Sequence, residues 1–257
     1  MTSRSRAAAL KHDPAFGPLR RSLEIYYDDA ARDAAMDALY AHFLRPGDLA
    51  FDIGSHVGDR IGSFRRIGAR VIALEPQPLC ARAIRAIYGG DTHVTMLEAA
   101  CSSRPGTLRM RINSANPTLS TASGEFMAAA DGAPGWEGQV WDETIAVAAT
   151  TLDDLMARHG APAFAKIDVE GFEDRVLAGL SRPLRGLSFE FTTIQQDVAL
   201  RCLARLASLG AYRFDVALGE SQRLTFGRWI CGADMVAHLA SLPRQANSGD
   251  VYCVLQR

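Results

Sequence analysis

An acidic residue and two glycines stand together just after an apolar run that ends near residue 51. Asp52 opens the segment, Gly54 and Gly58 follow, and Glu75 ends the next apolar run. Glycine lets the backbone turn tightly, so main-chain N–H groups at the start of a helix can face a ligand. A carboxylate at the end of the following strand is placed to accept the two hydroxyls of a ribose. This pattern predicts a binding site for a nucleoside.

The glycine spacing separates two classes of nucleoside ligand. A dinucleotide site has three glycines as G-x-G-x-x-G, which bring the backbone against a pyrophosphate, and the third is missing here. The acid before the first glycine and the second glycine four residues later look like the S-adenosylmethionine site of Rossmann-like methyltransferases. Small residues after the third apolar run suit a flat adenine ring. The residues that we expect to bind the cofactor are Asp52, Gly54, Ser55, His56, Gly58, Asp59, Glu75, Pro76, Gln77, Ala99, Ala100 and Asp168.

Three ionisable residues alternate with apolar ones at the end of another buried run. Lys166, Asp168 and Glu170 share one parity, so in a strand their side chains would face the same way. In doubly wound sheets, ligands bind at the carboxyl ends of the strands. We predict that Asp168 or Glu170 orients an acceptor or takes its proton, with Lys166 as electrostatic partner. Alternatively, Lys166 only pairs with a carboxylate and Glu170 only caps the next helix.

Two further residues are secondary candidates. Glu190 ends the apolar run 187–191 and could orient a substrate, hold a divalent cation together with Asp168, or pair with Lys166. The sequence has no dedicated cluster of metal ligands, so we predict no metal site. His56 could act as a base, but packing near the methionine end of the cofactor is the favoured interpretation.

Strands and helices alternate along the chain and must position these groups. Residues 49–78 form one strand-turn-helix-strand unit, and further strand-helix units follow. The prediction is an α/β fold with a seven-stranded, mostly parallel sheet, helices on both faces, and a last strand inserted antiparallel beside the fifth. The other expected strands lie at 93–97, 164–169, 187–191, 212–218 and 250–255, and the runs 107–112 and 145–148 could pair with each other.

The regions outside this alternation differ in character. We expect residues 1–44 to form an N-terminal helical extension, with 1–20 loosely ordered because Pro14 and Pro18 interrupt helices, and residues 45–257 to form one domain. Tyr26 and Tyr27 could line the cofactor mouth, although half-buried packing is favoured.

Residues 113–143 are rich in Asn, Ser, Thr, Gly and Pro and form an insert without apolar periodicity. We favour an irregular, substrate-covering segment there. Trp136 and Trp141 would then be contact residues, or would instead pin the insert to the body.

Composition limits the possible partners and compartment. The net charge is −1, so no global positive field would gather nucleic acid or an anionic membrane. No run is long and apolar enough for stable membrane insertion, and no signal-peptide core is present, which favours a cytoplasmic protein. The five cysteines are widely spaced without a C-x-x-C pair, which predicts reduced thiols and no structural zinc.

Three motifs together resemble the FkbM-type family of S-adenosylmethionine-dependent methyltransferases. The resemblance spans residues 45–195, and its last motif is the most specific. It implies a Rossmann-like methyltransferase fold, S-adenosylmethionine as cofactor, and methyl transfer to a hydroxyl of a sugar, polyketide or other small metabolite. An N-methyltransferase and a non-catalytic S-adenosylmethionine-binding scaffold remain alternatives, and the oligomeric state is left open. The motifs are FDIGSHVGD at 51–59, GARVIALEPQP at 68–78 and KIDVEGFE at 166–173.

Overall fold

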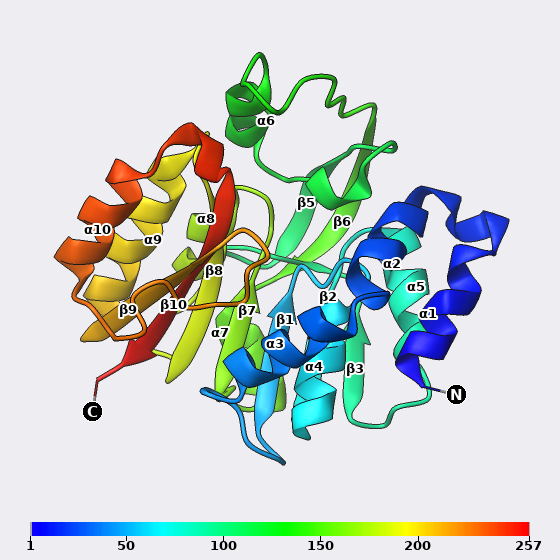
Figure 1. Cartoon of the computed structure of the whole chain (residues 1–257), viewed down its shortest axis with the longest axis horizontal. Helices are drawn as coiled ribbons and strands as arrows, with labels where there is room; N and C mark the ends of the chain where they lie inside the picture. The colour runs from blue at the N-terminus through cyan, green and yellow to red at the C-terminus, as the bar shows by residue number, and fades with distance from the viewer. Residues whose placement is uncertain (1, 257) are drawn as a thin grey trace.

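The computed structural model describes residues 2–256 and contains a seven-stranded sheet in the order β3-β2-β1-β7-β8-β10-β9 (Figure 1). Strands β3, β2, β1, β7 and β8 pair in parallel, whereas β10 is antiparallel to both of its neighbours. The predicted sheet, with its last strand inserted antiparallel, is therefore confirmed. The strands are β1 Leu49–Ile53, β2 Arg70–Leu74, β3 Val94–Leu97, β7 Phe164–Ile167, β8 Gly186–Thr192, β9 Tyr212–Leu218 and β10 Ser248–Leu255.

Helices cover both faces of this sheet because its strands are apolar on both sides. In β1, Leu49, Phe51 and Ile53 pack into one hydrophobic core, whereas Ala50 packs into the other. The first core is closed by α7 Leu152–His159, α8 Glu173–Ala178, α9 Gln196–Leu209 and α10 Gly232–Ser241. The second is closed by α3 Ala30–Tyr40, α4 Asp59–Ile67 and α5 Pro78–Tyr88, together with two helices nearer the N-terminus.

The N-terminal segment is more regular than the prolines predicted. It forms α1 Ser3–Lys11, a 3-10 turn Pro14–Leu19 and α2 Arg20–Tyr27. The expectation of loose order for residues 1–20 is therefore wrong for 3–20, and residue 1 lies outside the described residues. The prolines shape the connecting turn between the two helices. Arg6 donates from its guanidinium to the carbonyl of Ile87 at 2.9 Å, and Leu19 and Leu23 are fully buried in the second core.

A small second sheet lies beyond the carboxyl ends of the parallel strands. It contains β4 Ala100–Cys101, β6 Glu143–Thr150 and β5 Gly106–Ile112. Strands β5 and β6 pair with each other, as predicted, and are antiparallel. In Figure 1, β5, β6 and α6 Gly124–Ala130 lie above the main sheet. The edge of the sheet where ligands are expected is thus partly covered.

The insert 113–143 is folded rather than irregular. Besides α6 it contains the 3-10 turn Pro117–Leu119, and Phe126, Ala130 and Trp136 form a small buried cluster. The indole N–H of Trp141 donates to the carbonyl of Leu119 at 2.8 Å. The tryptophans therefore hold the insert together, and Ile194, outside the insert, packs against their cluster, which agrees in part with the interpretation that they pin the insert to the body.

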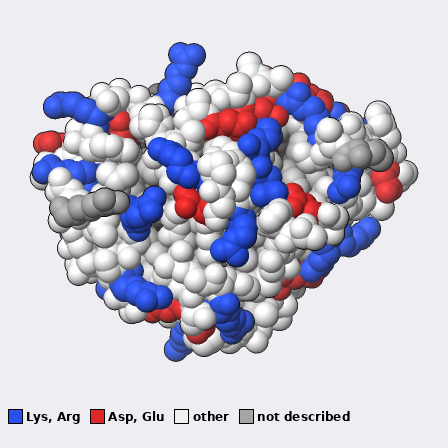
Figure 2. All heavy atoms as spheres, turned by 90° about the horizontal axis from the view of Figure 1, so that it is seen from below, with Lys and Arg blue, Asp and Glu red and all other residues white. Residues whose placement is uncertain are grey.

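The distribution of surface charge and the state of the cysteines are relevant to the expected partners and compartment. Positive and negative side chains are interspersed on the face seen in Figure 2. All five cysteines are free, and only Cys231 among them is not fully buried. Within residues 2–256, no helix is long and apolar enough to cross a membrane.

Candidate active site

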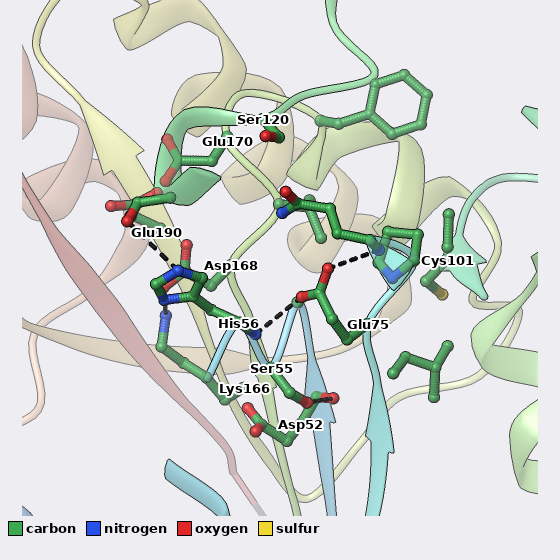
Figure 3. Close-up of a pocket in the computed structure, with 18 of the residues that line it drawn as sticks. Asp52, Ser55, His56, Glu75, Cys101, Ser120, Lys166, Asp168, Glu170 and Glu190 are labelled. Atoms are coloured by element: carbon green, nitrogen blue, oxygen red, sulfur yellow. Dashed lines mark hydrogen bonds and ion pairs between the residues drawn. The ribbon is translucent and has the colours of Figure 1, made fainter. Parts of the chain in front are cut away.

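A deep pocket opens at the carboxyl ends of β1, β2 and β7 and encloses about 990 Å³, including its open mouth. Figure 3 shows Asp168, Glu170 and Glu190 on one side, Glu75 in the middle and Cys101 on the other side. All but one of the residues predicted from the sequence line this pocket. They are Asp52, Gly54, Ser55, His56, Asp59, Glu75, Pro76, Gln77, Ala99, Ala100, Lys166, Asp168 and Glu170.

The two glycines of the turn have different structural roles. Gly54 has φ +83°, and a Cβ there would overlap the carbonyl oxygen of Asp168, so only glycine lets the turns after β1 and β7 touch. Gly58, which does not line the pocket, is the left-handed residue before α4, and a Cβ there would lie 2.8 Å from the ring of Tyr88. Two buried phenols hold this part of the turn. Tyr27 donates to the carbonyl of Val57 at 2.9 Å, and Tyr88 donates to that of Gly58 at 2.8 Å.

Asp52, at the end of β1, is a buried carboxylate without a partner in the described chain. It is 1% exposed, and neither of its carboxylate oxygens has a hydrogen-bond partner. Burial, with repulsion from Asp59, raises the pKa of Asp52 to about 7. A buried unpaired carboxylate is unfavourable, so this position is suited to a cationic group of a ligand.

Glu75, at the end of β2, is fixed by two main-chain donors. Its Oε2 accepts from the N–H of His56 and its Oε1 from the N–H of Gln77, both at 2.8 Å. Burial raises the pKa of Glu75 to about 7, although these hydrogen bonds oppose the shift. Each carboxylate oxygen keeps a second lone pair, so Glu75 can accept two hydroxyl groups of a ligand.

His56 forms part of the pocket wall as a neutral imidazole. Its ring meets that of Tyr26 edge-on, with centroids 5.8 Å apart, and its Nε2 lies 3.5 Å from Oγ1 of Thr118. Burial lowers the pKa of His56 to about 4. An imidazole with so low a pKa is a poor general base near neutral pH. Tyr26 lines the pocket, as the first interpretation of these tyrosines predicted. Tyr27 is instead buried by packing, as the second predicted.

Three carboxylates converge at one side of the pocket. Asp168 follows β7, Glu170 lies in the next turn, and Glu190 belongs to β8. One oxygen from each lies within 4.8 Å of the others. Lys166 is 1% exposed, and its ammonium lies 2.9 Å from Oδ2 of Asp168 and 2.7 Å from Oδ1 of Asp250. The cluster of Asp168, Glu170 and Glu190, called the acid cluster below, thus adjoins one buried cation.

The members of the acid cluster differ in proton affinity. Burial and the nearby Asp168 raise the pKa of Glu170 and of Glu190 well above the usual range. Burial also acts to raise the pKa of Asp168, but the Lys166 ammonium outweighs it and the pKa lies below normal. The cluster therefore combines an ionised carboxylate with two carboxyls that hold protons readily.

The alternative interpretation of Lys166 and Glu170, in which the first only pairs with a carboxylate and the second only caps the next helix, is partly correct. Lys166 does pair with carboxylates, those of Asp168 and Asp250. No hydrogen bond involves the Glu170 carboxylate among residues 2–256. Instead Oε1 of Glu173 accepts from the N–H of Val169 at 2.9 Å. Glu173, and not Glu170, thus holds the main chain of this turn, and the Glu170 side chain is left for the pocket.

Several residues of the site were missed in the sequence. Asp250 lies near the start of the antiparallel strand β10. The amino end of an antiparallel strand lies at the carboxyl edge of its parallel neighbours, a signal that could have identified Asp250. Glu220 lines the pocket from the loop after β9 and pairs with Arg32 at 2.7 Å and Arg60 at 3.2 Å. No local pattern marks Glu220, because its partners lie far away in sequence.

The carboxylates and small residues of the pocket fit the expected cofactor, S-adenosylmethionine. Asp52 is free to bind the ammonium of its methionine part, and Glu75 can accept its two ribose hydroxyls. Ala99 and Ala100 present small side chains, with Cys101 beside them, as a flat ring requires. These residues would hold the cofactor in the same pocket as the acid cluster.

Residues 52–206, more than half of the chain, match the model of a family described as the methyltransferase FkbM domain. No curated protein matches the chain in sequence.

Similar solved structures include a precorrin-6y C5,15-methyltransferase from Geobacter metallireducens, with TM-score 0.43, 16% identity, and coverage of 88% of this chain and 87% of that one. Fibrillarin from Aeropyrum pernix with natively bound S-adenosyl-L-methionine has TM-score 0.45, 12% identity, and coverage of 86% and 73%. A Geobacter sulfurreducens S-adenosylmethionine-dependent methyltransferase with S-adenosyl-L-homocysteine has TM-score 0.42, 13% identity, and coverage of 89% and 92%. These structural similarities are too weak to carry a conclusion about substrate or site.

Proposed function

Because this chain belongs to the FkbM methyltransferase family and is an S-adenosylmethionine-dependent methyltransferase, we propose that it methylates a hydroxyl group of a small metabolite, such as a sugar or a polyketide. The observation that carries this proposal is the acid cluster, which shares one pocket with the glycine turn and Glu75. Carboxylates beside a methyl donor can both orient an alcohol and take its proton.

The proposed mechanism assigns a separate task to each group. S-adenosylmethionine supplies an electrophilic methyl group, and an alcohol that attacks it must lose its proton. Ionised Asp168 would accept a hydrogen bond from the hydroxyl and align it, since alignment supplies much of the rate in such a displacement. Glu170 or Glu190, whose raised pKa makes its ionised form a stronger base than an ordinary carboxylate, would take the proton when ionised. Lys166 would keep Asp168 ionised.

The rest of the pocket supports an acceptor of small size. Leu108 and Met110 from β5 and Phe172 from the turn after β7 offer apolar surface, whereas Tyr26 and Glu220 offer polar groups. A molecule with hydroxyls on an apolar frame suits such walls. A nucleic-acid acceptor is not part of the proposal, since the acid cluster would repel phosphates.

A second candidate is methyl transfer to nitrogen. The acid cluster carries three carboxyl groups against the one Lys166 ammonium, and Asp250 adds a fourth. Such a surplus of acid attracts an amine, which must then lose a proton before it can react. For this reason the test includes amines as acceptors beside alcohols.

The test is a screen for methyl transfer with paired panels of alcohols and amines. Formation of S-adenosylhomocysteine is followed with sugars, polyketide-type alcohols and matched amines, and the methylated atom is identified by NMR. The proposal expects an alcohol product, with Glu170→Gln and Asp168→Asn lowering turnover while cofactor binding measured by calorimetry persists. Products formed only from amines would support the second candidate. Cofactor binding without product on either panel would indicate a scaffold.

We also propose a domain organisation and a cellular compartment for the protein. We treat residues 1–44 as a helical extension and residues 45–257 as the methyltransferase domain, with the insert at 113–143. Free cysteines, four of them buried, suit a reducing compartment, and we propose the cytoplasm. Fractionation of cells with an antibody against the chain tests the compartment.

A further inference from the structure

We propose that Thr121 is a positioning residue for Glu170, so that the insert 113–143 sets the geometry of the acid cluster. This inference rests on the proposed function only in giving Glu170 a role in the site. Thr121 is fully buried, and its hydroxyl donates to the carbonyl oxygen of Glu170 at 2.6 Å. The two residues are far apart in sequence, so this contact exists only in the folded chain.

The backbone of Glu170 needs such support. Its φ is 56°, in the left-handed region that is unfavourable for a residue with a Cβ. A conformation of this kind persists only where its surroundings fix it. The neighbouring turn is held on one side by the N–H of Asp168, which donates to Ile53 at 2.9 Å, and by the Val169–Glu173 bond described above. At Glu170 itself, the hydroxyl of Thr121 is the hydrogen-bond partner of the carbonyl.

Thr121 is itself fixed by the insert. Its main chain exchanges two hydrogen bonds with Arg111 of β5, at 2.7 and 2.9 Å. Its hydroxyl oxygen also accepts from the N–H of Ser123 at 2.8 Å. The hydroxyl thus uses its donor and its acceptor at once, and it forms a rigid link from β5 to the turn after β7.

A second contact joins the same two segments. Gly171, next to Glu170, has φ +81°, and a Cβ there would lie 2.8 Å from Cβ of Phe126 in α6. The insert therefore lies directly against this turn. Phe126 supplies close packing, which does not select a direction for the Glu170 carbonyl, whereas the Thr121 hydrogen bond does.

The consequence falls on the Glu170 carboxylate. Since this carboxylate has no hydrogen-bond partner in the described part of the chain, its place beside Asp168 and Glu190 depends on the main chain that carries it. Loss of the Thr121 hydroxyl would let the turn relax and move the Glu170 carboxylate out of the acid cluster. Glu170 would then titrate closer to an ordinary glutamate.

Lys166 offers a reporter that needs no acceptor. The chain has only two lysines, Lys11 and Lys166, so lysine labelled with ¹⁵N gives two ammonium signals, and Lys11→Arg assigns them. The Lys166 ammonium lies beside Asp168 in the acid cluster, so its chemical shift follows the ionisation of that cluster. The step that disappears in Glu170→Gln identifies the titration of Glu170.

The experiment titrates wild type, Thr121→Val and Thr121→Ser by this signal. We expect Thr121→Val, which keeps the shape but removes the hydroxyl, to move the Glu170 step down by about one pH unit or more. Thr121→Ser, which keeps the hydroxyl, should retain the wild-type step. Thr107→Val should retain it too, and serves as a control because Thr107 is an exposed threonine of β5, the strand to which Thr121 is bonded. If Thr121→Val does not fold, Thr121→Ala is titrated in its place.

An unchanged Glu170 step in a folded variant without the hydroxyl would overturn the proposal, and so would an equal change in Thr121→Ser. Calorimetry with S-adenosylmethionine checks that the cofactor site persists in each variant. Because neither measurement depends on turnover, failure to find an acceptor would count against the proposed function and leave the role of Thr121 intact.

Discussion

Replacement of Asp52 by asparagine should stabilise the free protein and weaken cofactor binding. Both effects have one cause. The Asp52 carboxylate is buried, and neither of its oxygens has a hydrogen-bond partner among the described residues. Asparagine has nearly the same shape without the charge, so Asp52→Asn removes the cost of burying the charge and also removes the partner of a cationic ligand group.

The magnitude follows from the pKa of Asp52. Burial raises the pKa from 3.8 to about 7, which corresponds to about 4 kcal/mol at 1.36 kcal/mol per pH unit. Between these values the folded protein binds more protons than the unfolded chain, so the free energy of unfolding falls as pH rises through this window. Asp52→Asn avoids this loss. We expect its gain in stability to be small near pH 4 and to reach up to about 4 kcal/mol near pH 8.

The effect on binding has the opposite sign. A hydrogen bond to a charged group contributes about 1.5–3 kcal/mol, so loss of the Asp52 charge should raise the Kd for S-adenosylmethionine by about 10- to 150-fold. Urea denaturation at pH 5 and pH 8, with calorimetric titration of the cofactor at pH 8, measures both effects.

Asp131→Asn, at an exposed aspartate, is the matched control and should change neither quantity. A loss of stability at pH 8 in Asp52→Asn would refute the reasoning, because it would mean that the ionised carboxylate has a favourable partner in the folded protein.

Three other predictions concern the same pocket. Gly54→Ala should abolish cofactor binding in calorimetry, because its Cβ would overlap the Asp168 carbonyl, whereas Gly124→Ala, with nothing within 4 Å, should bind normally. Lys166→Met should lower the free energy of unfolding by about 3–5 kcal/mol in urea titrations by leaving buried acids unpaired, whereas Lys11→Met, at a partly exposed ion pair, should cost at most about 1 kcal/mol. Cofactor binding should release protons near pH 7, since it favours the ionised form of groups whose pKa is raised to about 7. Calorimetry in buffers of different ionisation enthalpy measures this, and proton uptake would contradict it.

Much of the fold could be predicted from the sequence because the relevant patterns are local. The spacing of Gly54 and Gly58 predicts the turn after β1, because each of these positions has a positive φ that favours glycine. Short apolar runs identified the strands of the main sheet, and the order of strands and helices led to the parallel sheet. For the same reason Glu75 and Asp168 could be placed at one edge, as each directly follows or ends a strand.

The regions predicted wrongly depend on contacts between distant residues. Residues 1–20 have a polar composition, yet Leu19 becomes ordered because it packs against the body of the protein. In the insert, Phe126 and Trp136 form a core only after the chain has folded back on itself. Neither arrangement leaves a periodic pattern in the sequence.

The sequence by itself determined the family, the sheet and the residue types at the ends of its strands, because these follow from motifs and short-range periodicity. Only the tertiary structure decided how those residues are partnered. It left Asp52 unpaired, brought Asp250 of the antiparallel strand β10 to Lys166, and placed the Thr121 hydroxyl on the carbonyl of Glu170. Burial and distance set the charge of each group, and both quantities arise only when segments far apart in the chain pack together.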